Sequence, residues 1–199
     1  MSKGEETRQR IIAAAAPLFN KQGYAGCALK DIMEATGLEK GGIYRHFESK
    51  EELAAEAFDY AWTMASAFRR EGMDEIPDQV DRLKHYISAF ARRSAIPGGC
   101  PILNTGTDSD DGNPVLRDRV QKAMRNWQRM LQKTLNEGIA AGTVRFDIDV
   151  DKASRLIIAT LEGGMLISRI ERNDQAIKDA MSHLDEYLEN QVRASKQLS

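Results

Sequence analysis

Apolar residues recur along this chain at helical spacing, and the alternation typical of a strand is confined to one short stretch. Near the N-terminus an apolar stripe with the spacing i, i+4, i+7 and i+8 consists of Ile11, Ala15, Leu18 and Phe19. It predicts a helix over 7–22, which ends at a glycine. Pro17 has no amide proton to donate inside that helix, so we expect a bend there.

Two short helices and a longer one are predicted next. In the segment 29–36, Leu29, Ile32 and Met33 face inward, and the following Gly37 permits a tight turn. The third helix covers 40–47. Ser49 and Glu52 then have the spacing of a capping box, which predicts the start of a long helix.

The remaining pattern is helical as well, with breaks at segments rich in glycine, proline and aspartate. Helices are expected over 51–70, 78–94, 101–107, 114–141, 151–172 and 174–196. The stretch 143–150 alternates apolar and polar residues, but no second strand is available to pair with it. We therefore expect an extended connector there and an all-α fold for the chain.

Composition narrows the class of protein. The 199 residues are 42% hydrophobic and 29% charged, which suits a packed core and not a disordered chain. No apolar run approaches the roughly 18 residues of a membrane span, and the first residues lack the apolar run typical of a signal peptide, so a cytoplasmic protein without a membrane partner is expected. The two cysteines fit neither a disulfide framework nor a zinc site. No metal or cofactor is expected.

Charge is distributed unevenly along the chain. The segment 1–50 holds eight basic and six acidic residues, a net charge of +2, whereas the remainder holds 20 basic and 24 acidic residues, a net charge of −4. A basic segment attached to an acidic body is compatible with nucleic-acid binding. By itself this asymmetry is weak evidence.

The third predicted helix carries the most informative chemistry. At about 100° per residue, Ile43 and Phe47 share the inward face, and Tyr44, Arg45 and His46 spread over the opposite side. An arginine there can donate two hydrogen bonds to guanine O6 and N7 in a major groove. A tyrosine hydroxyl can reach a phosphate.

Residues around this helix suit the phosphate backbone. Gly41 and Gly42 have no side chains, so their backbone can approach a phosphate closely, and Lys40 and Lys50 bracket the helix with positive charge. Simpler roles stay open. Tyr44 could equally be a core residue, and Arg45 a solvated surface charge. His46 could serve only in packing, and Lys50 only to begin the next helix.

Several motifs in this region resemble the N-terminal domain of the tetracycline-repressor (TetR) family. They are Gly23-Tyr24, Asp31-Ile32, Ala35-Thr36-Gly37-Leu38, Lys40 to Phe47, and Ser49-Lys50-Glu51-Glu52-Leu53. The resemblance covers about 7–53 and implies an all-α homodimer. It implies an N-terminal three-helix helix-turn-helix DNA-binding domain over 1–50, followed by a larger helical ligand-binding and dimerisation domain over 51–199.

The chain departs from the family pattern at several positions. Cys27 and Ala28 stand where the family has a Thr or Ser that caps the second helix and touches a phosphate. Glu39 replaces a capping hydroxyl, and Gly42 replaces a common threonine. Together, the residues expected to contact DNA are Cys27, Ala28, Lys40, Gly41, Gly42, Tyr44, Arg45, His46 and Lys50.

The larger domain carries no equally sharp motif. The resemblance implies a small-molecule site among the middle helices, and an ordinary helical core is the alternative for each residue. Candidate ligand-binding residues are Trp62, Phe68, Tyr86, Phe90, Cys100, Ile102, Asn104, Met124, Trp127, Gln128, Leu161 and Met165. Cys100 lies at an expected helix start, so both a thiol sensor and a small buried cysteine fit it.

The last two long helices carry apolar stripes that suit a dimer interface. The candidates are Leu156, Ala159, Thr160, Gly163, Ile167, Met181, Leu184 and Leu188. Two helices from each subunit would form a four-helix bundle. A core buried within one chain competes with this interpretation for part of each stripe.

These observations predict a ligand-responsive DNA-binding transcriptional regulator. Its simplest form is a homodimeric repressor that a small-molecule effector releases from a palindromic operator in double-stranded DNA. The alternatives are a DNA-binding architectural or scaffold protein without an effector and, behind it, a helical enzyme of unrecognised type. An enzyme is not expected, because a nucleophile elbow, a P-loop, a dinucleotide-binding fingerprint and a zinc helix motif are all missing. The three histidines fall on different predicted helices.

Overall fold

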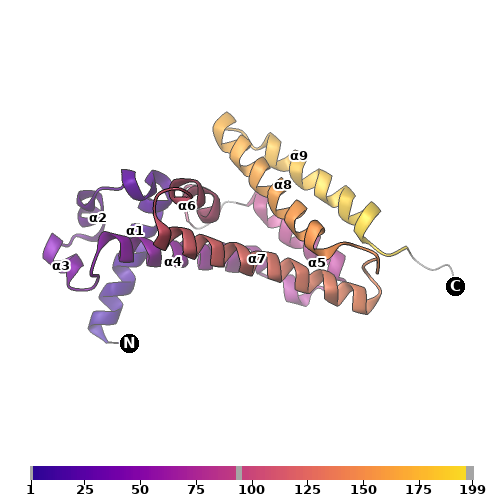
Figure 1. Cartoon of the computed structure of the whole chain (residues 1–199), viewed down its shortest axis with the longest axis horizontal. Helices are drawn as coiled ribbons and strands as arrows, with labels where there is room; N and C mark the ends of the chain where they lie inside the picture. Colours follow the sequence, from indigo (N-terminus) through magenta and orange to yellow (C-terminus); the bar gives the residue numbers. More distant parts are fainter. Residues whose placement is uncertain (1, 93–95, 196–199) are drawn as a thin grey trace. The chain divides into compact units, whose positions relative to one another are not determined.

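The computed structural model describes residues 2–92 and 96–195, and these residues are nearly all helical (Figure 1). They divide into two compact units. The first comprises 2–66 and 96–124, and the second 67–92 and 125–195. The predicted all-α fold is confirmed. The division into a DNA-binding domain over 1–50 and a ligand-binding domain over 51–199 stays a prediction. The two compact units do not follow it, because residues 96–124 pack with the N-terminal residues.

The first unit contains α1 (Lys3–Gly26), α2 (Leu29–Thr36), α3 (Lys40–Tyr44), α6 (Pro101–Ser109) and the first parts of α4 (Lys50–Arg70) and α7 (Pro114–Ala141). The second unit contains the rest of α4 and α7, η1 (Met73–Glu75), α5 (Gln79–Ser88), η2 (Ala89–Ala91), α8 (Val150–Glu171), α9 (Gln175–Tyr187) and η3 (Leu188–Val192). The predicted helices are therefore present, with shifted ends.

α1 begins at a capped end and is interrupted by a glycine. The Ser2 hydroxyl accepts the amide of Glu5 at 3.2 Å. The non-helical backbone inside α1 lies at Gly23, with φ 74° and ψ 172°, and not at Pro17. A positive φ costs glycine little, whereas the ring of Pro17 is compatible with helical φ. The predicted bend at Pro17 is thus replaced by a kink at Gly23.

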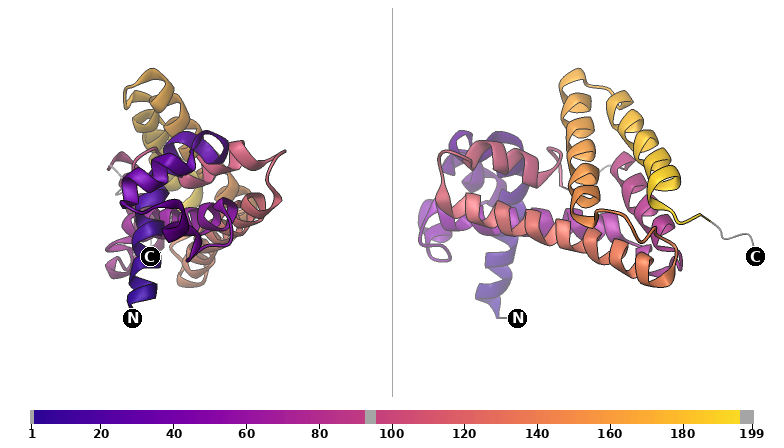
Figure 2. Two further views of the ribbon diagram at one scale, coloured as in Figure 1. Left: turned by 90° about the vertical axis from the view of Figure 1, so that its left-hand side faces the viewer. Right: turned by 45° about the vertical axis from the view of Figure 1, so that its right-hand side comes forward.

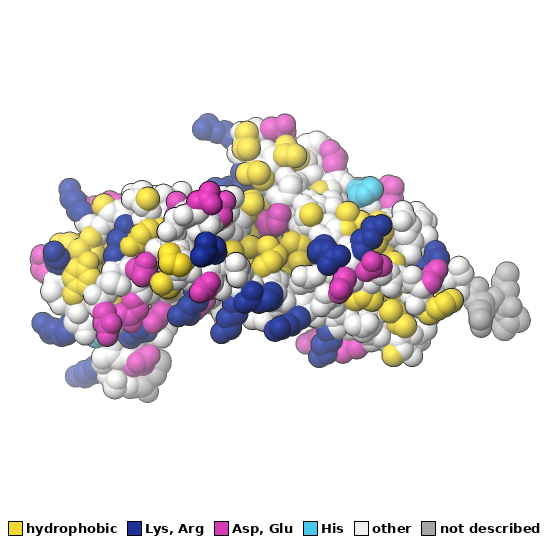
Figure 3. Space-filling model, viewed as in Figure 1, with side chains coloured by type: hydrophobic (Ala, Val, Ile, Leu, Met, Phe, Trp, Pro, Cys, Tyr) yellow, Lys and Arg dark blue, Asp and Glu magenta, His cyan; other side chains and the backbone are white. Residues whose placement is uncertain are grey.

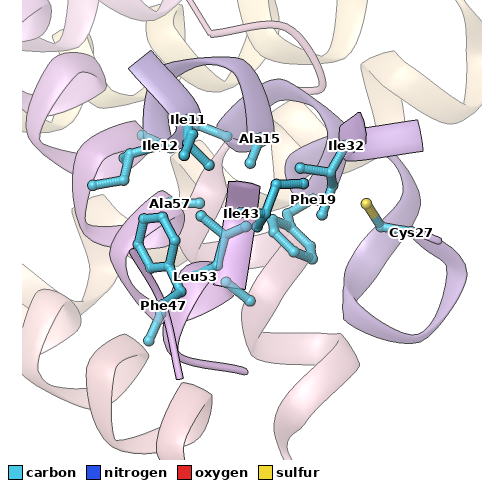
Figure 4. Packing of buried hydrophobic residues seen from close by; sticks show 14 of the residues in the cluster. Ile11, Ile12, Ala15, Phe19, Cys27, Ile32, Ile43, Phe47, Leu53 and Ala57 are labelled. Atoms are coloured by element: carbon cyan, nitrogen blue, oxygen red, sulfur yellow. The ribbon is translucent and has the colours of Figure 1, made fainter. Parts of the chain in front are cut away.

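A single apolar cluster holds the N-terminal helices together. Figure 4 shows Ile11 of α1, Ile32 of α2, Ile43 of α3 and Leu53 of α4 pointing toward a shared core. Each is at most 1% exposed, and burying such a side chain stabilises the fold by about 1.5–3 kcal/mol. Helices as short as α2 and α3 do not persist alone in water, so this packing is what keeps them folded.

Arg8 adds a polar attachment to this cluster. Its guanidinium pairs with Glu56, reaches Glu52 at 3.1 Å, and lies 4.6 Å from the ring centroid of Phe47. Its Nε donates to the carbonyl of His46 at 3.4 Å. Arg8 therefore connects α1 to α4 and to the segment that follows α3.

The segment before α6 is attached to α1 by the amide side chains of the buried Asn20 and the half-buried Asn104. Asn20, which is 5% exposed, donates through Nδ2 to the carbonyls of Pro97 at 2.9 Å and Gly99 at 3.2 Å. Asn104 donates to the Asn20 carbonyl and to the Gly98 carbonyl, both at 2.8 Å. Because both amide nitrogens donate to carbonyl oxygens of the other segment or of the loop between them, α6 and α1 are held in one register.

In the second unit α8 and α9 lie side by side and run antiparallel (Figure 2). Gly164 permits their close approach, since a Cβ there would lie 2.8 Å from the Cβ of Ala180. Leu184 and Leu188 are fully buried within the protomer. Their prediction as dimer-interface residues is therefore wrong, and the competing interpretation of a core within one chain holds for them.

The C-terminal helix is shorter than predicted, and the connector 143–150 is not fully unpaired. Regular α-helix ends at Tyr187, and a π-helical turn carries the chain to Val192. The Arg145 amide then donates to Val192, and the Ala194 amide to Thr143, both at 2.9 Å. One antiparallel bridge, Val144 with Arg193, results. None of the helices in the described residues is long and apolar enough to cross a membrane.

Gly98→Ala should destabilise the protein, because Gly98 has φ +111° and an added Cβ would lie 2.9 Å from the Asn20 side chain and carbonyl. Strain of this kind costs on the order of 2 kcal/mol, so the midpoint of thermal unfolding should fall by about 4–8 °C. Gly41→Ala is the control, because an added Cβ there meets nothing within 4 Å. Equal midpoints for both variants would contradict this account of the loop.

Both cysteine thiols should resist alkylation in the folded protein. Cys27 and Cys100 are fully buried thiols outside any disulfide, and burial raises the pKa of the Cys27 thiol, which keeps it protonated near neutral pH. Iodoacetamide labelling followed by mass spectrometry should modify neither cysteine before unfolding and both after it. Rapid labelling of Cys100 in the folded protein would instead support the thiol-sensor interpretation.

Candidate nucleic-acid interface

The two ends of α2 are set by backbone hydrogen bonds and one carboxylate. The cap residue Ala28 has no side-chain acceptor, but its amide donates to the Asp31 carboxylate at 3.0 Å. At the other end, Gly37 takes a left-handed conformation with φ 69° and donates to the Met33 carbonyl at 2.9 Å. In place of a hydroxyl, the Ala28 carbonyl accepts the Asp31 amide at 3.1 Å, and Gly37 gives α2 a defined exit toward α3.

α3 is a helix of only five residues. Its cap residue Glu39 makes no side-chain capping bond, and the amide of Gly42 closes the first turn on the Glu39 carbonyl at 2.8 Å. The predicted helix over 40–47 ends early, at Tyr44. The His46 amide then donates to Ile43 at 2.9 Å in a tighter turn, because two glycines leave little helix propensity to extend the element.

The two faces of this element differ sharply in burial. Ile43 and Phe47 are 1% and 2% exposed, whereas Tyr44 is 37% exposed, Arg45 is exposed and His46 is half-buried. Within the residues that the structure describes, the Arg45 side chain makes no hydrogen bond or ion pair. A cation that is held on a rigid backbone and has no internal partner is available to an external one.

The basic and small residues beside α3 are arranged as follows. Lys40 and Gly41 are exposed, as is Ala28, and the Lys40 ammonium lies 5.9 Å from the Tyr44 ring centroid. Lys50 is half-buried, donates to the Tyr24 carbonyl at 2.6 Å, and lies 4.5 Å from the Tyr24 ring centroid. It therefore serves the junction of α1 and α4. Phosphate contact by Lys50 stays a prediction.

Cys27 does not belong to this surface. It is fully buried in the apolar cluster of the first unit, so its predicted contact with DNA is wrong. The family position carries a hydroxyl, which favours water and phosphate, whereas a cysteine behaves as a small apolar side chain and turns inward.

The candidate ligand-binding residues are divided between the two units. Trp62, Cys100, Ile102, Asn104 and Met124 lie in the first, and Phe68, Tyr86, Phe90, Trp127, Gln128, Leu161 and Met165 in the second. Within the second unit, the rings of Phe90 and Trp127 stack with centroids 6.0 Å apart, and Tyr86 meets Phe90 edge-on at 5.7 Å. The Asn104 side-chain N–H groups donate to the Asn20 and Gly98 carbonyls and so attach α6 to α1.

Among the buried polar residues that the sequence pattern did not single out, Asn20 and Arg69 stand out by their contacts. Asn20 holds the segment 97–99, and Arg69 is 4% exposed with its guanidinium 4.1 Å from the Phe90 ring centroid. The signal for Arg69 was its spacing, since it follows the buried residues Ala61 and Ala65 at i, i+4 and i+8. A charged residue on an otherwise buried apolar stripe is a candidate for a functional role, because burying a charge is costly.

An apolar stripe on α8 remains uncovered. Leu156 is 37% exposed and Ile167 47% exposed, and Ala159, Thr160 and Gly163 on the same side are exposed or half-buried. The stripe also includes the 43% exposed Leu166 and the 72% exposed Ile170, which the sequence analysis did not select. Figure 3 shows hydrophobic side chains at the top of the view, over the C-terminal end of α8. Met181 on α9 is half-buried.

Nothing in the described residues assembles a metal site, since no three His, Cys, Asp or Glu side chains are placed to share an ion. The charged residues form ion pairs instead, some within one helix and some between helices. Arg119 of α7 pairs with Asp59 of α4, where burial raises the pKa of Asp59 and the arginine opposes that shift.

Comparison with known proteins gives consistent matches along the chain. A family model described as bacterial regulatory proteins, tetR family, matches residues 11–57, and one described as tetracyclin repressor-like, C-terminal domain, matches residues 78–184. The transcriptional repressor DhaR of Mycobacterium sp. (strain GP1) is 29% identical over 187 residues, which cover 91% of each chain.

Two solved structures agree closely with this fold. A TetR transcriptional regulator from Chloroflexus aurantiacus J-10-FL shares 46% identity with a TM-score of 0.93, over 98% of this chain and 100% of that one. A TetR-family regulator from Cytophaga hutchinsonii shares 34% identity, also with a TM-score of 0.93, over 98% and 99% of the two chains. The predicted family is therefore confirmed: the chain belongs to the TetR family of helix-turn-helix transcriptional regulators, which are DNA-binding proteins and not enzymes.

Proposed function

We propose that this chain acts as a homodimeric repressor that reads a palindromic operator through α3 and leaves it when a small molecule binds. The observation that carries the proposal is the exposed, internally unpaired Arg45 next to the exposed Tyr44, on an element whose other face is fully buried. In helix-turn-helix proteins the second helix lies in the major groove and its side chains contact base edges. Lys40, Gly41, Gly42, Ala28 and His46 complete the proposed contact surface.

The dimer face is proposed to be the uncovered stripe of α8. Large apolar side chains that stay in water lose the stabilisation of burial, and a second copy of the same stripe would restore it. The small residues Ala159 and Gly163 lie between the large apolar residues of the stripe, and they allow the α8 backbones of the two subunits to come close. A two-fold dimer presents two α3 elements, which can read half-sites spaced by one turn of DNA.

The structural change that effector binding causes is proposed to reach α3 through the side-chain amides of Asn20 and Asn104. The segment 97–99 and α6 are attached to α1 through this pair. The apolar cluster in turn joins α1 to α3. A ligand that shifts α6 would therefore shift α1, and coupling of this kind is commonly worth about 1–3 kcal/mol.

Arg45→Ala should weaken binding to operator DNA by about 1–3 kcal/mol, roughly 5- to 150-fold, because it removes a bidentate contact to a base. The operator is first selected from a random duplex pool, and affinity is then measured by fluorescence anisotropy over a salt series. Lys178→Ala, an exposed position on α9, is the control and should leave affinity unchanged. Unchanged affinity in Arg45→Ala would exclude this role of α3.

Ile167→Asp should convert the dimer to a monomer, because a carboxylate placed in an apolar interface is costly to desolvate. Light scattering after gel filtration should then give the chain mass of 22.2 kDa and not twice that mass. The matched control is Val115→Asp on α7, since Val115 is 39% exposed but lies outside the stripe. A dimer of normal stability in Ile167→Asp would place the interface elsewhere.

A further inference from the structure

We propose that the effector of this regulator is a small organic carboxylate and that Arg69 binds its carboxylate group. The inference rests on the proposed function, because it names the chemical class of the molecule that releases the repressor. It depends on one residue of the second unit that neither DNA binding nor dimerisation uses.

Arg69 is a buried cation without an acceptor. Near the C-terminal end of α4 it is 4% exposed, and its Nη1 is buried with no hydrogen-bond partner. Among the residues that the structure describes, no carboxylate pairs with it. Removing a guanidinium from water is expensive, so buried arginines are normally matched by an anion. The missing anion points to a ligand.

The surroundings of Arg69 position its guanidinium but do not satisfy it. The guanidinium lies 4.1 Å from the centroid of Phe90, whose ring stacks on Trp127 and meets Tyr86 edge-on. A cation over an aromatic face gains electrostatic attraction, yet the ring supplies no lone pair to an N–H group. The aromatic stack therefore orients the planar fork of N–H donors, and this fork matches the two oxygens of a carboxylate.

A second arginine in the same unit provides the comparison. The guanidinium of Arg92 lies 4.6 Å from the centroid of Phe68, but Arg92 is exposed, and its Nη2 donates to the Phe68 carbonyl at 3.5 Å. Because Arg92 is exposed, its remaining N–H groups face solvent water. Arg69 has the same aromatic contact without the water, so an apolar residue would stabilise its position more. A residue that costs stability where it stands is typical of a functional site.

The first test measures ligand binding with matched probes. The dimer is titrated with straight-chain carboxylates from acetate to decanoate and with benzoate and naphthoate, each paired with its neutral amide, by thermal shift and calorimetry. At least one carboxylate should bind saturably while its amide does not. Arg69→Met should weaken that binding at least about 30-fold, and the control Arg92→Met should leave it unchanged. If no carboxylate exceeds its amide, the proposal is overturned.

The second test needs no ligand and separates a binding role from a structural one. Arg69→Met keeps an unbranched side chain but removes the unmatched charge, so the ligand-free unfolding midpoint should rise by about 2–6 °C. A fall in the midpoint would make Arg69 a structural residue and overturn the proposal. Should Arg69→Met not fold, Arg69→Lys serves instead. It keeps the charge, loses the fork, and should weaken carboxylate binding about tenfold or more.

DNA release then distinguishes this inference from the proposed function. The carboxylate identified above should lower the affinity of the wild-type dimer for its selected operator, and the same addition should not change the DNA affinity of Arg69→Met. If both proteins respond equally, the repressor function stands and the role of Arg69 is wrong. If the wild type selects no DNA sequence, the repressor proposal fails, while the thermal shift still reports on Arg69.

Discussion

The structure depends on the burial of Ile43 and Phe47 between α1 and α4. A five-residue helix with two adjacent glycines has almost no stability of its own, so its position comes from these two side chains. Their burial fixes the rotation of α3, and that rotation alone decides that Tyr44 and Arg45 face water. The Arg8 guanidinium, set over the Phe47 ring and paired with two glutamates, reinforces the same contact.

The helices α2 and α3 also show how a family architecture tolerates the loss of characteristic residues. Ala28 cannot cap α2 with its side chain, and Asp31 compensates from the third helical position by accepting the Ala28 amide. Cys27, freed from a capping role, joins the core. These substitutions leave the geometry of α2 and α3 intact and change only which groups can reach a phosphate.

Two buried polar residues meet the cost of desolvation differently. Asn20 is saturated by backbone carbonyls and by Asn104, so it holds α6 on α1 as part of the fold. Arg69 has an aromatic ring for a partner and an Nη1 with none. The first arrangement specifies structure, whereas the second leaves an interaction open for a molecule that the chain does not contain.

Sequence alone determined the helices, the amphipathic division of α3 and the family, because these follow from local periodicity and from a motif of fixed spacing. It did not determine which side of an apolar stripe packs within the protomer. Leu184 and Ile167 look alike in the pattern, yet one is fully buried and the other half in water. Nor did it show that Cys27 turns inward, that Gly23 and not Pro17 interrupts α1, or that Arg69 meets Phe90. Each of these depends on contacts between residues distant in the chain, which only the tertiary structure brings together.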